Sequence, residues 1–201
     1  MLQVTWEWLG AEAALDIANT VAVSDGVEHD LLAPAGEYER WAATAADSPE
    51  LVSEEARELP AARPSVLELR EPIRRLLAAT AAGERPPKSA VAELNGLSRK
   101  CPVWLELGPD GDLRERVGGS AADRLLATYA RSALQIAADG PSRLRVCPAP
   151  SCGMYYRPGR SDQRWCSVQC GTRARVARHA HARRAARISD AASISSTPGS
   201  G

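Results

Sequence analysis

Four of the five cysteines in this 201-residue chain lie between Cys147 and Cys170, in a polar stretch marked by glycine and proline. Cys147 and Cys152 are separated by four residues, Cys166 and Cys170 by three, and the two pairs by thirteen. Two close pairs at such a spacing suit a tetrahedral zinc site, because each pair binds one edge of the tetrahedron and the intervening chain can form a hairpin. The spacing predicts one Zn²⁺ ion held by four thiolates.

The alternatives for these cysteines are two disulfides or four ordinary thiols. We expect a cytoplasmic protein, because the sequence opens without a signal-peptide pattern and contains no apolar run of about 18 residues for a membrane span. Neighbouring disulfides are uncommon in that reducing compartment.

A closed shell of four thiolates leaves no position for water, so the zinc is expected to be structural. A module of roughly 40 residues has too little core to fold without it.

Cys101 stands apart from the cluster and is expected to be an ordinary half-buried thiol.

The charge of the chain is unevenly distributed, although its total is zero. Residues 1–142 contain 14 Lys and Arg against 23 Asp and Glu, whereas residues 143–188 contain 11 Arg against one acid. The basic segment and the cysteine cluster therefore coincide, as is typical of a nucleic-acid-binding module. We expect an acidic domain over residues 1–142, a basic metal-binding module over 143–188 and a disordered tail over 189–201.

Apolar periodicity makes the first domain mainly helical. The expected helices lie in residues 11–23, 36–46, 50–59, 65–83, 88–98 and 120–139, with Ser48 and Ser120 as caps of the third and the last. Pro72 lies inside the fourth, so that helix either kinks there or begins at about Glu71. A loop is expected from Ser24 to Pro34. Alternating residues on both sides of the turn Gly-Pro-Asp-Gly predict one small hairpin over residues 102–117.

Within the basic module, residues 154–156 are expected to form a strand that returns through residues 163–165. A helix is expected to start at Cys166 and to continue through an arginine-rich segment whose apolar content is Val176 and alanines. Such a helix cannot bury a wide face, and guanidinium groups pair well with phosphate. The predicted nucleic-acid contacts are Arg157, Arg160, Arg164, Thr172, Arg173, Arg175, Arg178, Arg183 and Arg184. The alternative is a solvated helix, or one that docks on the acidic first domain.

Asp16 and Asn19 are candidates for binding a small polar ligand, together with Trp6, Trp8 and Trp41. The structural alternative is that Asp16 forms hydrogen bonds within the fold, Asn19 ends a helix and the tryptophans belong to the core. No phosphate-binding loop or nucleophile with a histidine partner is present, so we expect a protein without catalytic activity.

Several of these motifs resemble those of known domain families. "CPAPSC", "RWCSVQCGTR" and the basic helix beyond them resemble the CGNR-type zinc finger of bacterial proteins, in which a pair of cysteines is followed by Trp-Cys-Ser and then by Cys-Gly-Asn-Arg. "LDIANT", "LREPIRRLLAATAAGERPP" and "LNGLS" resemble the helical ABATE domain that precedes this finger. The resemblance covers most of the chain. It implies a mainly α protein: a helical N-terminal domain with a small β-hairpin, then a small zinc-ribbon or treble-clef-like finger ending in a basic helix.

Such proteins are described as stress-induced transcription regulators, or as RNA-binding zinc-ribbon-like proteins. The family asparagine is Thr172 here, between the matching Gly171 and Arg173. The threonine hydroxyl can form a hydrogen bond near the metal or to a phosphate. It lacks the amide group whose oxygen and nitrogen together pair with the edge of an adenine. If that asparagine reads a base in relatives, the sequence preference of this chain is expected to differ.

The sequence therefore favours a zinc-containing, DNA-binding transcription regulator. RNA binding remains an alternative, as does an adaptor whose basic helix binds an acidic protein partner. A small-molecule effector at the first domain and a homodimer are compatible with each of these readings.

Overall fold

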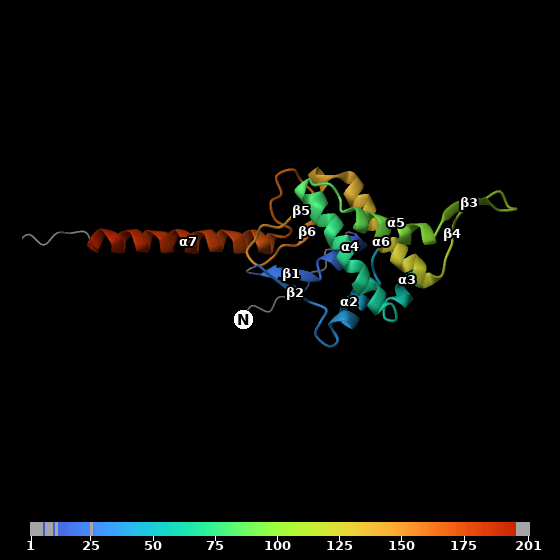
Figure 1. The fold of residues 1–201 in the computed structure, drawn as a ribbon, viewed down its shortest axis with the longest axis horizontal. Coiled ribbons are helices and arrows are strands. Elements are labelled where there is room, and N and C mark those ends of the chain that lie inside the picture. Colours follow the sequence, from blue (N-terminus) through green and yellow to red (C-terminus); the bar gives the residue numbers. More distant parts are fainter. Residues whose placement is uncertain (1–5, 7–9, 11, 25, 196–201) are drawn as a thin grey trace, which may run out of the picture.

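The computed structural model describes residues 6, 10, 12–24 and 26–195 of the chain. Helices form a central body, a long helix extends from one end of it, and a hairpin projects from the opposite end (Figure 1). Within the described part of the chain, no helix combines the length and the apolar character needed to cross a membrane. Trp8 lies outside the described residues.

The elements of the body come first in the chain and the metal-binding module follows. They are α1 (Ala13–Ala18), β1 (Val21–Ser24), β2 (Val27–Asp30), α2 (Glu37–Ala45), α3 (Ser53–Glu58), α4 (Arg63–Ala82), α5 (Lys88–Lys100), β3 (Val103–Leu107), β4 (Leu113–Val117), α6 (Ala121–Asp139), the 3-10 turn η1 (Pro141–Arg143), β5 (Arg145–Val146), β6 (Tyr155–Tyr156) and α7 (Val168–Ser195). The strands form three separate two-stranded antiparallel sheets. The mainly α class is confirmed.

The core of the body is built around α6, which packs against α1, α3, α4 and α5. The helix is capped by Ser120, whose hydroxyl accepts a hydrogen bond from the Asp123 amide, as expected of an N-cap. The ring of Tyr129 on its buried face lies 6.4 Å from that of Trp41 on α2. The apolar stripe of α4 faces the same core through Ile73 and Leu77.

Pro72 does not interrupt α4, which begins at Arg63. Pro64 lies in the first turn, where its missing N–H costs nothing, and this start was not expected. The helix expected over 50–59 begins only at Ser53, and Ser48 accepts a hydrogen bond from the Glu50 amide instead of capping it.

The first expected helix is wrong in its second half. α1 ends at Ala18, and residues 21–24 form β1, which pairs with β2 inside the expected loop. The two strands are short, and every residue of β2 is exposed. An alternating pattern of burial is therefore missing, which is why the sequence did not distinguish this hairpin from a loop.

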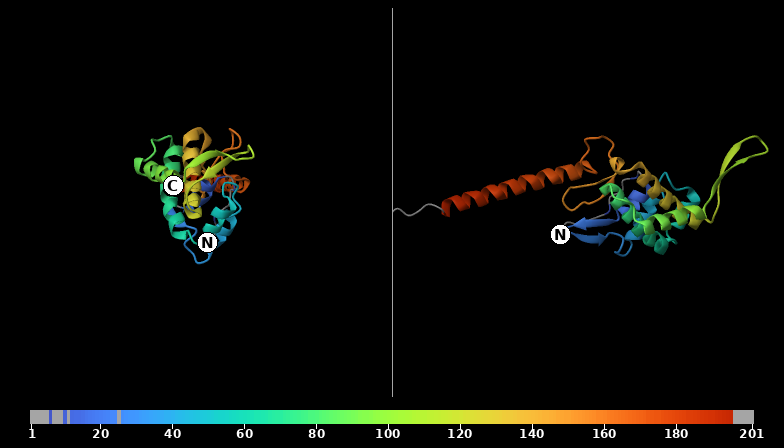
Figure 2. Two further views of the ribbon diagram at one scale, coloured as in Figure 1. Left: turned by 90° about the vertical axis from the view of Figure 1, so that its right-hand side faces the viewer. Right: turned by 45° about the horizontal axis from the view of Figure 1, so that its top comes forward.

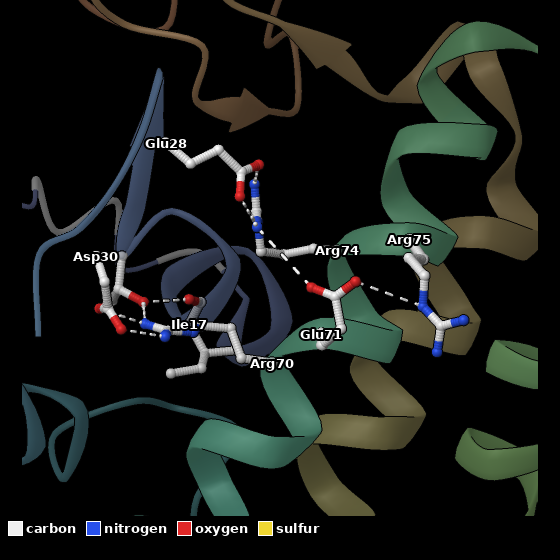
Figure 3. A network of polar contacts seen from close by, with 8 residues as sticks. Ile17, Glu28, Asp30, Arg70, Glu71, Arg74 and Arg75 are labelled. Atoms are coloured by element: carbon white, nitrogen blue, oxygen red, sulfur yellow. Dashed lines mark hydrogen bonds and ion pairs between the residues drawn. The ribbon is translucent and has the colours of Figure 1, made fainter. Parts of the chain in front are cut away.

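Two arginines of α4 attach this hairpin to the body (Figure 3). Arg70 binds Asp30 with two hydrogen bonds of 2.8 and 2.6 Å, and Arg74 binds Glu28 with two of 3.3 and 2.5 Å. Hydrogen bonding from Arg70 is the main reason that the pKa of Asp30 lies below its usual value. Forked guanidinium–carboxylate pairs fix orientation as well as distance. The β1–β2 hairpin is thus held beside the metal-binding module.

Asn19, the C-cap of α1, joins the body to that module. Its amide nitrogen donates to the carbonyl of Tyr155 at 2.9 Å, and its amide oxygen accepts from the N–H of the same residue at 2.8 Å. Both backbone groups of Tyr155 are thereby satisfied by one buried side chain. Arg157 adds ion pairs to Glu12 at 3.2 Å and to Asp139 at 2.6 Å. The module is therefore docked on the body through several polar contacts.

Asn19→Ala is expected to lower the free energy of unfolding by on the order of 2 kcal/mol, because it removes the hydrogen-bond partners of two backbone groups of the half-buried Tyr155. Chemical denaturation followed by circular dichroism measures this change. Asn95→Ala, at a half-buried position on α5, is the control and should change the stability little. Equal losses in the two variants would contradict the proposed role of Asn19.

Candidate metal centre

The first cysteine pair lies on a tight turn between β5 and β6. Cys147 donates its N–H to the Met154 carbonyl at 2.8 Å, and Cys152 donates to the Ala149 carbonyl at 3.2 Å. Ser151 and Gly153 have φ values of 55° and 69°, so the chain turns sharply on both sides of Cys152. A Cβ at Gly153 would lie 3.4 Å from the Cβ of Val23, which shows that the turn rests on β1.

The strand expected over residues 154–156 is present, but its partner is different. β6 pairs with β5, through Arg145 opposite Tyr156 and Val146 opposite Tyr155. Residues 163–165 form no strand. Instead, the loop before them is tied down by Arg145, which donates to the carbonyls of Gln163 and Ser161. The β5–β6 hairpin therefore holds the first cysteine pair in its connecting turn, and it does not join the first pair to the second.

The second pair lies at the start of α7. Cys170 is in the first turn of the helix, but Cys166 precedes Val168 and is not helical, which corrects the expected start at Cys166. The Ser167 hydroxyl accepts from the Cys170 amide at 3.2 Å, as an N-terminal cap does. A Cβ at Gly171 would lie 3.3 Å from the ring of Trp165. The glycine thus allows this tryptophan to pack closely against the helix.

The four sulfur atoms converge on one point. All four lie within 4.8 Å of one another. The measured separations are 3.7 Å for Cys152–Cys166, 3.5 Å for Cys166–Cys170 and 3.6 Å for Cys170–Cys152. A tetrahedron with zinc–sulfur bonds of about 2.3 Å has edges of about 3.8 Å, whereas a disulfide needs about 2.05 Å. The separations therefore fit a four-thiolate zinc site and exclude the disulfide alternative, and all five cysteines are free.

The thiols influence the ionisation of one another. Hydrogen bonding from Cys166 is the main cause that lowers the pKa of Cys152 to about 5, while the same contact raises the pKa of Cys166. Burial raises the pKa of Cys147. The cluster thus favours one thiolate at Cys152, whereas burial and the neighbouring sulfurs oppose ionisation of Cys147 and Cys166. A divalent cation removes that opposition, which is the electrostatic reason for a metal here.

Hydrogen-bond donors lie beside two of the sulfurs. The guanidinium of Arg173 donates to the Cys170 sulfur at 3.0 Å, and the N–H of Cys166 donates to the Cys147 sulfur at 3.5 Å. Four thiolates around Zn²⁺ carry a net charge of −2, so a cation and N–H donors beside the sulfurs stabilise the loaded site. Arg173 was predicted to contact nucleic acid, but its guanidinium lies against a metal ligand. Sequence spacing alone did not reveal this role.

Cys101 differs from the four cluster cysteines. It is completely buried beside Gly119 at the base of β3, more deeply than the half-buried position expected. Burial is the main cause that raises the pKa of its thiol. It is separate from the group of four, as expected.

The structure places the predicted nucleic-acid contacts in different surroundings. Arg157 is docked on the body through Glu12 and Asp139, and Arg173 lies against Cys170. Thr172 is exposed, but its hydroxyl donates to the Val168 carbonyl and accepts from Arg175, both within α7. Arg160 is exposed beside Asp162 at 3.6 Å. The remaining arginines lie on the surface of the module: Arg164, Arg175, Arg178, Arg183 and Arg184.

A groove of about 400 Å³ lies between the cysteine turn, Trp165 and α7. Pro148 and Pro150 line one wall, and Ala174 and Ala177 of α7 line the other. Its cationic residues are Arg164, Arg178 and His181. The guanidinium of Arg164 lies 5.9 Å from the centre of the Trp165 ring. The groove therefore combines an apolar floor with positive charge, and His181 was not among the predicted contacts.

The ligand-binding hypothesis for Asp16 and Asn19 is replaced by their structural alternative. Both residues are buried, with 3% and 2% of their surface exposed. The amide group of Asn19 is used by Tyr155, and Asp16 accepts a hydrogen bond from the Gly10 amide at 3.3 Å. Trp41 is a core residue, whereas Trp6 is half-buried and donates to Glu37 at 3.3 Å.

Cys170→Ala is expected to reduce bound zinc from about one ion per chain to none and to unfold the module, because three thiolates do not close the shell. Cys101→Ala is a matched control, since both sulfurs are completely buried and only one belongs to the cluster. Zinc content by elemental analysis, with circular dichroism, measures the difference. Full zinc in the Cys170 variant would contradict this assignment.

Arg173→Ala is expected to weaken zinc binding about 10-fold in competition with a chelator, because it removes a charged donor to a ligand sulfur. Arg173→Lys should restore part of the loss. Arg175→Ala removes the same charge from an exposed position two residues away and should leave the affinity for zinc unchanged. Similar losses for both alanine variants would mean that general charge, not the contact with Cys170, is responsible.

Two family models match the chain. The ABATE family, described as "Putative stress-induced transcription regulator", matches residues 11–140, and the CGNR zinc finger matches residues 143–184. A comparison with curated proteins found no match. The zinc-finger match agrees with the sulfur geometry, so the cluster is a site for one structural zinc ion. The architecture implied by the sequence motifs is confirmed, and the chain belongs to the ABATE family, with a CGNR zinc finger at its C-terminal side.

Proposed function

We propose that this protein binds nucleic acid through its zinc finger, with DNA as the preferred partner, and that it acts in transcriptional control. The proposal includes a cytoplasmic location and no catalytic role. The main observation in its support is that the arginines of the body and those of the finger surface differ in their ion pairs with acids.

Arginines of the body are largely neutralised by acids. Arg70 pairs with Asp30, Arg74 with Glu28 and Arg124 with Glu54. In the described part of the chain, no acidic partner is found for Arg164 or for the exposed α7 arginines 175, 178, 183 and 184. Positive charge without a partner in the same chain is available to phosphate, with release of counterions.

The shape of the finger agrees with this use. α7 spans 28 residues, which corresponds to roughly 40 Å of helix, and it extends away from the body in Figure 1 and in the right-hand view of Figure 2. A helix that is free on most of its circumference can enter the major groove of DNA, which is wide enough to admit one. This direction disfavours the alternative in which the basic helix docks on the acidic domain.

The groove beside Trp165 is the proposed centre of the interface. Arg164, beside Trp165, and Arg178, on α7, both line the groove and can contact neighbouring phosphates. The zinc ion holds these walls together, because Cys147 and Cys152 anchor one and Cys170 the other. Removal of the metal is therefore expected to abolish nucleic-acid binding as well as the fold of the finger.

Arg164→Ala and Arg178→Ala are each expected to weaken binding several-fold and to reduce the slope of log affinity against log salt by about one, as the loss of one phosphate contact does. Fluorescence anisotropy with labelled duplex DNA and with RNA, over a salt series, measures both quantities. Arg85→Ala is the control, because it removes one exposed arginine from the loop between α4 and α5.

Binding of the zinc-loaded parent to DNA, with weaker binding to RNA and little effect of Arg85→Ala, would support the proposal. Tighter binding to RNA would reassign the partner. Zinc-loaded protein that binds neither nucleic acid would contradict the proposal and favour a protein partner for the basic helix.

A further inference from the structure

The β3–β4 hairpin projects from the body at the end opposite to α7 (Figures 1 and 2). Every residue of both strands is exposed. An isolated two-stranded hairpin is marginally stable in water and gains stability when one face packs against another element. Its exposure therefore raises the question of what covers it.

The register of the hairpin separates an apolar face from a charged one. Residues directly opposite in an antiparallel pair lie on the same face, and neighbours along a strand lie on opposite faces. The hairpin face, as we call it, consists of Val103, Leu105, Leu107, Leu113 and Val117, with Glu115 beside Leu105. The other face carries Trp104 with Glu106, Arg114 and Arg116, and Glu106 pairs with Arg116 at 3.0 Å.

The hairpin face is unusually exposed for its composition. Leu105, Leu107 and Leu113 are 64%, 69% and 66% exposed. A contiguous group of five such side chains is the kind of patch that marks an interaction site. The charged face already has an internal ion pair, so the apolar face is the one in need of a partner.

We propose that the hairpin face is the interface of a homodimer, in which two copies pack apolar face to apolar face around a two-fold axis. Each of the five side chains offers on the order of 100 Å², so two copies bury roughly 1,000 Å² in total. That area is at the lower limit of specific interfaces. A concentration-dependent dimer is therefore expected, not an obligate one.

A second copy of the hairpin face suits this surface better than another part of the same molecule. The exposed apolar residues of α7 are Val168 and Val176, and α7 lies on the opposite side of the body from the hairpin. Contact between hairpin and α7 of different copies would be head to tail and would not close unless the copies formed a ring. Two identical hairpin faces close in a pair, and they leave both α7 helices outside the interface.

Sedimentation velocity of the full zinc-loaded chain, from about 1 µM to about 100 µM, tests this proposal. The parent is expected to shift from monomer to dimer over this series. Leu105→Glu should weaken dimerisation at least 10-fold, because it places a second negative charge directly opposite Glu115 at the centre of the hairpin face. Glu106→Lys, the next residue on the opposite face, is the control and should still form dimers.

Leu107→Lys provides a second test on the same face, so that the result does not depend on one variant. Zinc content and circular dichroism verify that each variant is folded, and both leucines are exposed positions on which the core does not depend. A parent chain that stays monomeric throughout the series would overturn the proposal and leave the face to a different protein. Dimers that persist in both leucine variants would also overturn it, because another surface would then be responsible.

Discussion

Four thiolates can share one zinc ion only if they approach to about the edge length of its tetrahedron, and the finger is organised by that requirement. The sulfurs come from two different kinds of local structure, the turn between β5 and β6 and the segment that leads from Cys166 into the first turn of α7. Each contributes little core of its own. The metal joins them, and by holding Cys170 it fixes the start of a helix that is otherwise exposed. The position of the basic surface therefore depends on the metal site.

The body determines how this finger is oriented. Asn19 pairs with the backbone of Tyr155 through hydrogen bonds of 2.9 and 2.8 Å, and Arg157 reaches two acids of the body. The turn at Gly153 rests on β1, whose hairpin is held to α4 by Arg70 and Arg74. Metal coordination thus fixes the internal shape of the finger, whereas these polar contacts fix its direction. Together they direct α7 away from the body.

Arginine illustrates how one residue type acquires different roles in this chain. Arg74 secures a hairpin, Arg157 docks the finger, Arg173 supports a ligand sulfur, and Arg178 lines a groove. The uneven charge along the chain indicates that the finger is basic. The charge distribution does not tell which guanidinium groups are available to bind phosphate. That depends on whether each group contacts an acid or a sulfur in the folded chain. Only the unpaired arginines can carry the proposed function.

The sequence alone determined the zinc ligands, most helices of the body and the β3–β4 hairpin, because each of these depends on spacing within a short segment. Cys147, Cys152, Cys166 and Cys170 lie at ligand spacing, Ser120 caps α6, and alternation marks residues 102–117. The tertiary structure decided the rest. It pairs β5 with β6, makes a strand of residues 21–24, sets Arg173 against Cys170 and turns Asn19 from a candidate ligand residue into a junction. Asn19 and Tyr155 are far apart in the chain, and a contact between distant residues leaves no periodicity in the sequence. The strands are too short to show a pattern, and the position of Arg173, three residues after Cys170, gains its meaning only once the sulfurs are brought together.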